Sequence, residues 1–360
     1  MKMRESNLRS GTAAAALRCF TATLLLAAAP ASAAVFCVDT AAELVQALTD
    51  AAGNGVADEI RVVAGTYTPS PEPDYTATVS QDLTISGGWS PTCLGQRPDP
   101  TLTTISGTPS HRGMQIYVTN TTANVTIRYL TFRDGNAGAE TGGGLRVTGT
   151  SGNHLNATLE GCILRSNTAS SGGGLEFSSD LGTLRMAGNL IYGNTGTTNM
   201  AGVLITANGP SGEVVHNTIA TNTITGGGNW GGLRIAGGNP VVFANNIFWG
   251  NSGIDLKLAN SDTYFLYAND IESQEGTAAG GANNVSVAPQ YIGGSNYRLQ
   301  PTSTLVDAGD AVQATLPAID LDTGPRELGL GPDLGAYEWG NLFADGFELG
   351  SAIVWDATVP

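Results

Sequence analysis

The sequence predicts an all-β fold: a single-stranded parallel β-helix with a short capping helix near its N-terminus. One segment recurs six times between residues 125 and 274, at offsets of 23 to 32 residues. Each copy alternates apolar and polar residues between Asn and Gly turns, which is typical of short strands. No stretch of 10–15 residues between these strands has helical periodicity, so βαβ units are excluded. A β-sandwich or a β-propeller is the competing architecture.

Four columns define the repeat. Two columns are apolar in every copy, and they are expected to fill the interior of the coils. Their members are Ile127, Leu159, Met186, Val214, Phe243 and Leu266, and then Phe132, Leu164, Ile191, Ile219, Phe248 and Ile271. The other two columns become Asn in the later copies, as Asn189, Asn217, Asn246 and Asn269, and as Asn167, Asn194, Asn222 and Asn251. Asn tolerates left-handed backbone and bonds to neighbouring groups, so we expect inward ladders of Asn side chains.

The composition limits the classes of function. The chain has 49 Gly in 360 residues, without the strict period of collagen, and its paired glycines are expected at coil corners. Its formal net charge of −15 argues against a nucleic-acid partner, because such binding needs Lys and Arg to replace counterions. Beyond the N-terminal region no long apolar run occurs, so no transmembrane segment is expected in the mature chain.

Residues 1–33 have the pattern of an export signal. Lys2, Arg4, Arg9 and Arg18 precede an apolar run over 19–29, and Ala31-Ser32-Ala33 is a cleavage pattern. We therefore expect a secreted or cell-surface protein, cleaved near Ala33. Cleavage would remove four positive charges and one negative charge, leaving −18 from −15, with Lys257 as the remaining lysine.

Residues 34–124 are expected to form an N-terminal cap and the first, irregular coils. Residues 40–50 have helical apolar spacing, and Thr40 with Glu43 makes a capping box. Such a helix would cover the open end of the solenoid. In an oxidising compartment Cys37 and Cys93 could pair, which leaves Cys162 as a buried free thiol.

Two parts of the chain resemble known families. The capping helix followed by "ADEIRVVAGTYT", together with "SNTASSGGGL" and "GNWGGLRI", resembles pectin-lyase-like β-helix proteins. This resemblance implies that residues 125–300 form right-handed coils. Residues 301–340, with "STLVDAGD", "DLDTGPR" and "DLGAYE", resemble a choice-of-anchor Q domain. The tail at 341–360 resembles an end segment of secreted bacterial proteins. Together these features imply an exported protein that is released or held at the cell surface.

Catalytic constellations are not visible in the coils. Enzymes of the resembled superfamily cleave acidic polysaccharides, either with Ca²⁺ and an Arg or with clustered aspartates. The column after the paired glycines contains Arg146, Glu176, Leu204, Arg234 and Asp255, whose two carboxylates are not on adjacent coils. A glycosidase needs two carboxyl groups some 5–10 Å apart. His216, beside an Asn column, is interpreted as a turn or surface residue.

A stripe of outward residues is the best candidate for ligand binding. It contains Arg133, Arg165, Tyr192 and Trp249, to which Trp230 of the loop 226–232 could add. Aromatic faces stack on sugar rings, and arginines can bind uronate carboxylates in a fork. The alternative is an ordinary solvated strand face, with Trp249 packed under a loop.

No cofactor is required by the sequence, but Asp320, Asp322 and Asp333 place oxygens that could bind Ca²⁺. Turn-forming aspartates are the alternative. Three functions therefore remain in view: a non-catalytic, adhesin-like protein that binds polysaccharide or surface glycan; a polysaccharide lyase or glycoside hydrolase; and a structural spacer.

Overall fold

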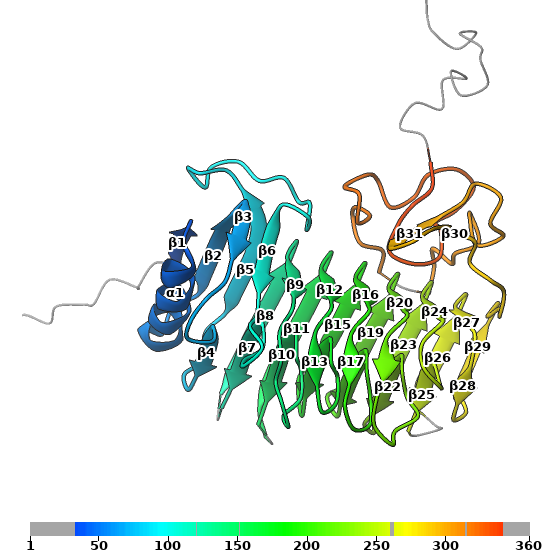
Figure 1. The fold of residues 1–360 in the computed structure, drawn as a ribbon, viewed down its shortest axis with the longest axis horizontal. Coiled ribbons are helices and arrows are strands. Elements are labelled where there is room, and N and C mark those ends of the chain that lie inside the picture. Colours follow the sequence, from blue (N-terminus) through cyan, green and yellow to red (C-terminus); the bar gives the residue numbers. More distant parts are fainter. Residues whose placement is uncertain (1–32, 120, 151, 260–262, 314, 341–360) are drawn as a thin grey trace, which may run out of the picture. The chain divides into compact units, whose positions relative to one another are not determined.

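The computed structural model describes residues 33–340, apart from residues 120, 151, 260–262 and 314. Within these residues the chain forms a parallel β-solenoid of eight coils (Figure 1), each built from one strand of each of three long sheets. The predicted right-handed parallel β-helix is confirmed. The predicted tail at 341–360, and all but the last residue of the predicted signal peptide, lie outside the described residues.

The three long sheets are parallel throughout. Sheet A contains β1 (Ala34–Val38), β2 (Asp58–Val63), β5 (Leu83–Trp89), β8 (Thr122–Arg128), β11 (His154–Glu160), β15 (Leu184–Ala187), β19 (Gly212–Val215), β23 (Val241–Ala244), β26 (Tyr264–Tyr267) and β29 (Gly280–Ala282). Sheet B contains β3 (Gly65–Tyr67), β6 (Thr103–Ser106), β9 (Thr131–Arg133), β12 (Ile163–Arg165), β16 (Leu190–Tyr192), β20 (Thr218–Ala220), β24 (Ile247–Trp249) and β27 (Asp270–Ile271). Sheet C contains β4 (Asp74–Ala77), β7 (Met114–Val118), β10 (Leu145–Gly149), β14 (Leu175–Ser179), β18 (Val203–Ala207), β22 (Leu233–Ala236), β25 (Leu256–Leu258) and β28 (Gln274–Glu275). At one corner, β13 (Thr168–Ala169), β17 (Thr195–Gly196) and β21 (Thr223–Ile224) form a small fourth sheet.

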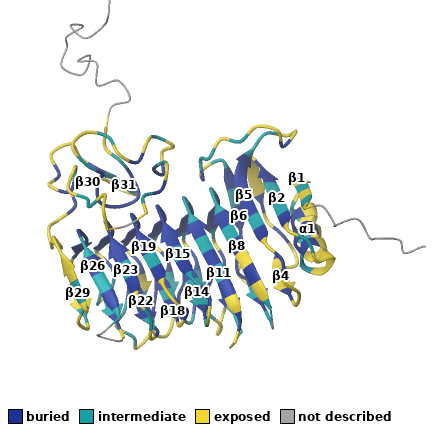
Figure 2. Ribbon diagram, turned by 180° about the vertical axis from the view of Figure 1, so that it is seen from behind, coloured by how far each residue is buried: buried dark blue, intermediate teal, exposed yellow. Residues whose placement is uncertain are grey.

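The apolar columns of the sequence stack in register inside the coils. Ile127 pairs with Leu159, and Leu159 with Met186, each almost completely buried. The alternation of buried and solvent-facing residues along the strands is visible in Figure 2. Complete burial of such a side chain contributes about 1.5–3 kcal/mol, so the repeated columns are the main source of stability in the solenoid.

Two ladders of Asn side chains run along the inside of the solenoid, as the sequence predicts. Asn189 donates from Nδ2 to the Leu159 carbonyl of the preceding coil at 3.0 Å and to Oδ1 of Asn217 on the next coil at 2.9 Å. The first ladder continues through Asn246 and Asn269. The left-handed backbone lies at the residue before each of these Asn residues, such as Gly188 before Asn189. The Asn side chains therefore serve the ladder, whereas their neighbours form the corner.

The N-terminal end of the solenoid is closed by α1 (Ala41–Asn54). Thr40 and Glu43 form the predicted capping box, and buried Leu44 and Leu48 join the main core. Strand β1 pairs in parallel with β2, and Cys37 in β1 forms a disulfide with Cys93, the pairing that the sequence suggests. Cys162 is a buried free thiol. No helix in the described part of the chain has the length and apolarity to span a bilayer.

The last strand of the long sheets, β29, ends at Ala282. Residues 288–340, here called the C-terminal segment, then turn back over the outer face of sheet B (Figure 1). The segment contains the antiparallel hairpin of β30 (Tyr291–Gly293) and β31 (Asn296–Leu299). It therefore covers part of the outer face of sheet B. As a result, sheets B and C have different surroundings on their outer faces.

Candidate functional site

The outer face of sheet C carries a row of side chains, one from each coil, and all of them except Leu204 are polar. Strand pairing places these residues in a single column, here called the sheet C row. Its members in order are Asp74, Gln115, Arg146, Glu176, Leu204, Arg234, Lys257 and Glu275. Neighbouring coils are about 4.8 Å apart, so the row is a continuous track along the solenoid.

The structure corrects one member of this column. Sequence alignment placed Asp255 after Arg234, but the pairing of β22 with β25 places Lys257 there. The corner before β25 is longer than the repeat suggests, so the strand starts at Leu256. Asp255 instead points inward and closes the second Asn ladder, accepting hydrogen bonds from the backbone N–H and Nδ2 of Asn251 at 3.0 and 2.8 Å.

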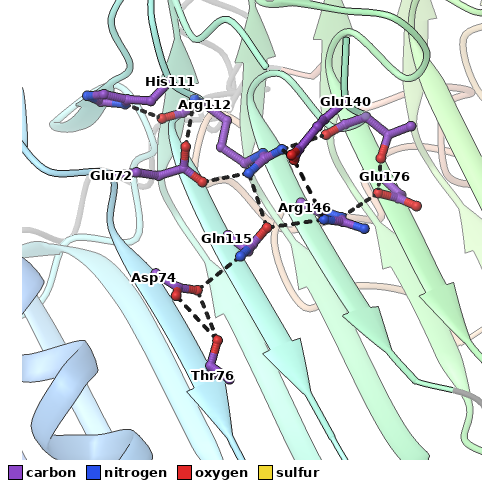
Figure 3. Close-up of polar contacts among 10 residues, drawn as sticks. Glu72, Asp74, Thr76, His111, Arg112, Gln115, Glu140, Arg146 and Glu176 are labelled. Carbon is purple, nitrogen blue, oxygen red and sulfur yellow. Dashed lines mark hydrogen bonds and ion pairs between the residues drawn. The ribbon is translucent and has the colours of Figure 1, made fainter. Parts of the chain in front are cut away.

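The N-terminal part of this face is organised around Arg112, just before β7 (Figure 3). The Arg112 side chain is only 6% exposed. Its Nη1 lies 2.7 Å from Oε1 of Glu72, and its Nη2 lies 2.5 Å from Oε2 of Glu140. Burial opposes the charge on Arg112, but the hydrogen bonds to Glu140 and Glu72 outweigh it and raise the pKa of this guanidinium. Arg112 is therefore held permanently charged against the sheet.

Arg146, one coil further on, extends this network (Figure 3). Its Nε donates to Oε2 of Glu176 at 2.7 Å, and its Nη1 donates to Oε1 of Gln115 at 3.3 Å. The same Nη1 lies 3.9 Å from Oε2 of Glu140, so that carboxylate oxygen faces both arginines. The hydrogen bond from Arg112 is the main reason why the pKa of Glu140 is lowered.

A second cluster lies near the other end of the sheet C row and is built around Trp230. The Trp230 indole donates from Nε1 to Oε2 of Glu275 at 2.8 Å, and Lys257 pairs with the same carboxylate. Arg234 Cζ and Lys257 Nζ each lie 5.8 Å from the Trp230 ring centroid, within the range of cation–π attraction. This Trp230 cluster fixes an aromatic ring between basic side chains on the face of the sheet.

Two carboxyls on this face that bond to basic side chains, Glu140 and Glu275, have lowered pKa values. A glycosidase acid needs a carboxyl whose pKa is raised. Hydrogen bonds from Lys257 and Trp230 instead lower the pKa of Glu275, in the same direction as for Glu140. Burial raises the pKa of Glu338 in the C-terminal segment to about 7, and it also raises the pKa of Asp58 and Asp255 in the coils. The face of sheet C therefore offers fixed charges and an aromatic ring.

The predicted binding stripe on sheet B is only partly accessible. Arg133, Arg165, Tyr192 and Trp249 do share one outward column. From Tyr192 onward, however, the C-terminal segment covers it: Tyr192 packs on Tyr297 with ring centroids 4.9 Å apart. Trp249 packs against a cluster that includes Leu299, Leu305 and Leu334.

Trp230 lies in the loop before β22, where its side chain contacts residues of the sheet C row, and it does not join this stripe. The sequence does indicate that the outer face of sheet B is covered, because Ile163, Leu190 and Ile247 are apolar residues on that face. Strands that are apolar on both sides are expected to be buried on both faces. Tyr192 and Trp249 of the stripe are therefore packed under the C-terminal segment, and binding by the stripe stays a prediction.

The three aspartates proposed as metal ligands are engaged in turns of the C-terminal segment. Asp320 accepts hydrogen bonds from the backbone N–H groups of Asp322, Gly324 and Glu338. Asp322 pairs with Arg298, and Asp333 accepts from the N–H groups of Asp307 and Trp339. Within the described ranges no group of three or more His, Cys, Asp or Glu residues is placed to hold a metal ion. Hydrogen bonds from backbone N–H groups to Asp320 and Asp333 are those of turn-forming aspartates, the alternative to metal binding.

His216 differs from its expected surface position. It lies in a coil corner with φ of 54°, as a turn residue, but its side chain is completely buried. Burial, and then the positive charge of Arg326, hold its pKa well below the usual value. The neutral ring bonds through Nε2 to Asn245, which also bonds to Asp310 of the C-terminal segment.

This architecture is a right-handed parallel β-helix. Residues 42–275 match the family described as Protein of unknown function (DUF1565), and the chain belongs to that family. A crystal structure of pectate lyase Pel9A is similar over 79% of this chain and 88% of that chain, with 12% sequence identity and a TM-score of 0.30. That likeness carries no argument about activity. No curated protein shows significant similarity to the chain.

Proposed function

We propose that this protein is exported and binds an extended polysaccharide along the outer face of sheet C, without cleaving it. The observation that carries the proposal is the Trp230 cluster. An aromatic ring held by Glu275 between Arg234 and Lys257 offers both a stacking surface and charged donors. Sugar rings combine an apolar face with hydroxyl groups at the rim, and this pairing of contacts suits them.

The spacing of the sheet C row favours a ligand that is long rather than compact. Arg146 and Arg234 belong to the same row and are separated by three coil steps, which correspond to about 14 Å. A polymer lying parallel to the solenoid axis would reach both the Trp230 cluster and the Arg112 network. A monosaccharide could contact only one of them.

Export and surface association form part of the same proposal. Residues 1–33 have the signal-peptide pattern, and the Cys37–Cys93 disulfide suits an oxidising compartment. The resemblance of residues 301–340 to a choice-of-anchor Q domain supports a position at the cell surface. A surface protein that binds glycan without cleaving it would act as an adhesin or a matrix component.

Trp230→Ala tests the binding face directly. The protein lacking residues 1–33 would be titrated with a panel of neutral and acidic polysaccharides. We expect at least one polymer to bind, and Trp230→Ala to weaken that binding about tenfold or more, since stacking and hydrogen bonding are both lost. Trp339→Ala is the matched control, because Trp339 is 41% exposed but lies in the C-terminal segment. It should leave the affinity unchanged.

The same samples distinguish binding from catalysis. New unsaturated or reducing ends, released from any polymer over pH 5–10 with and without Ca²⁺, would contradict a non-catalytic role and favour a lyase or hydrolase. Wild-type protein that binds no polymer in the panel would overturn the proposed function and leave the spacer hypothesis.

A further inference from the structure

Glu140 occupies an unusual position in the sheet C network. Its side chain is 66% exposed, yet one of its oxygens contacts the almost completely buried Arg112 and faces Arg146. The contact places a solvent-facing carboxylate in the gap between two guanidinium groups (Figure 3).

Both arginines have other carboxylate partners. Arg112 is paired with Glu72, whose side chain is 23% exposed, and Arg146 is paired with Glu176, whose side chain is 15% exposed. If the Glu140 side chain moved away, neither arginine would be left as an isolated charge. Such isolation is what makes the loss of a buried partner severely destabilising. Glu140 is thus the carboxylate that the network can lose.

The backbone around Glu140 is fixed independently of its carboxylate. The Glu140 N–H donates to the Ala137 carbonyl at 3.0 Å. The Glu140 carbonyl accepts from the backbone N–H of Ser170 at 2.9 Å and from its hydroxyl at 2.7 Å. Rotation of the side chain alone could therefore release the carboxylate into solvent while the loop keeps its place on the coil.

We infer that Arg112 and Arg146 form a recognition site for a carboxylate group of the bound saccharide, and that Glu140 fills this site until the ligand displaces it. This inference rests on the proposed function, and it names the ligand class as a uronate-containing polysaccharide. A carboxylate is favoured because one already fits the gap, at 2.5 Å from Arg112 Nη2. Arginine binds such planar groups through paired N–H donors.

The test compares Glu140→Gln and Glu140→Ala with wild type. A uronate oligomer, a sulfated oligomer and a neutral oligomer of equal length would be titrated in parallel. Removal of an internal competitor should raise the affinity for the uronate oligomer about tenfold and leave that for the neutral oligomer unchanged. Arg146→Gln should weaken uronate binding without changing neutral binding. Glu213→Ala, which removes a comparable carboxylate paired with Arg185 on sheet A, is the matched control.

A second readout keeps the two proposals distinguishable. The Nε–H signals of Arg112 and Arg146 can be followed by NMR while trigalacturonate is added to Glu140→Ala. A shift at both arginines supports the site even if no polymer binds. If these signals stay fixed, or if folded Glu140 variants bind uronate no better than wild type, the inference is overturned, whereas an effect of Trp230→Ala would still support the proposed function. A gain for the sulfated oligomer alone would overturn the assignment to carboxylate.

Discussion

Asp270 has a raised pKa because burial leaves its carboxyl poorly partnered. The side chain is fully buried, and one oxygen accepts from the Val287 N–H at 2.9 Å. Among the described residues its other oxygen, Oδ2, has no hydrogen-bond partner, and the same holds for the Tyr291 hydroxyl. Burial raises the pKa of Asp270 to about 7. This carboxyl therefore holds a proton in the folded protein at a pH where it would lose it in the unfolded chain.

The sign of the resulting pH dependence follows from linkage. The folded state binds this proton more tightly, so its contribution is complete below about pH 4 and is lost as the pH rises through about 7. We expect Asp270→Asn to stabilise the protein at pH 8 by about 2–4 kcal/mol relative to wild type and to change little at pH 4. Urea unfolding at both pH values is the measurement.

Asp50→Asn, at an exposed site in α1, is the matched control substitution and is measured in the same way. Asp333 and Glu338, whose pKa values burial raises to about 6 and about 7, give both proteins a slope of the same sign. His216 acts in the opposite direction, because its lowered pKa makes stability fall as the pH drops below about 6.5. Equal slopes for wild type and Asp270→Asn would contradict the prediction.

The second glycine of each corner pair is required by space rather than by backbone conformation. A Cβ on Gly144 would lie 2.5 Å from Nδ2 of Asn167, and one on Gly174 would lie 2.9 Å from Nδ2 of Asn194. The Asn ladder and the glycine pairs, which are separate patterns in the sequence, are therefore two sides of one packing contact.

At the scale of elements, the position of the C-terminal segment depends on how closely it packs against sheet B. Gly335 lies at the contact, with φ of 89°, and its N–H donates to the Asn245 carbonyl at 2.7 Å. The next residue, Ala336, donates to the hydroxyl of Thr218 at 3.0 Å. A Cβ at position 335 would lie 2.6 Å from that hydroxyl and 2.8 Å from Cδ1 of Ile247.

Gly335→Ala should loosen the C-terminal segment without unfolding the coils. Both the positive φ and the contacts with Thr218 and Ile247 oppose a methyl group, and strain of this kind is typically about 1–3 kcal/mol. We expect faster amide hydrogen exchange in β16, β24 and β31, and binding of a hydrophobic dye to the uncovered face. Gly227→Ala, at an open position with nothing within 4 Å of its Cβ, is the control. Unchanged exchange in these strands would show that the segment tolerates the methyl group.

At the scale of the whole molecule, the stability of each coil depends mainly on its contacts with the neighbouring coils, as in other solenoids. The Asn ladders add bonds of this nearest-neighbour kind. Asn217 accepts from the backbone N–H and Nδ2 of Asn189 and donates to Oδ1 of Asn246, so it joins three successive coils. A defect at this position should therefore act locally along the stack.

Asn217→Ala should destabilise the middle of the solenoid. The change leaves the buried N–H of Asn189 without its acceptor and opens a gap in the core, for which we expect a loss of about 2–4 kcal/mol. Hydrogen exchange should speed up in β15, β19 and β23, while β2 and β5 stay protected. Asn208→Ala, at an exposed position, should change stability by less than about 0.5 kcal/mol. Uniform loss of protection along all coils would contradict the nearest-neighbour description.

The sequence by itself determined the coils, because their information is local and repeated. The apolar columns, the two Asn ladders and the capping helix at 40–50 are each visible as a spacing, and the structure confirms them. The member Asp255 was wrongly aligned because a corner of different length shifts the frame by two residues. The spacing of the repeats does not reveal such a shift.

Only the tertiary structure decided which faces remain open. The C-terminal segment lies about a hundred residues further along the chain than much of the face it covers, and no periodicity links Tyr297 to Tyr192. Its position depends on long-range fit, and it covers Tyr192 and Trp249 of the predicted stripe on sheet B. The Arg112 network likewise unites Glu72 and Glu140 from different coils. Stacking of coils brings these residues together, whereas the sequence separates them.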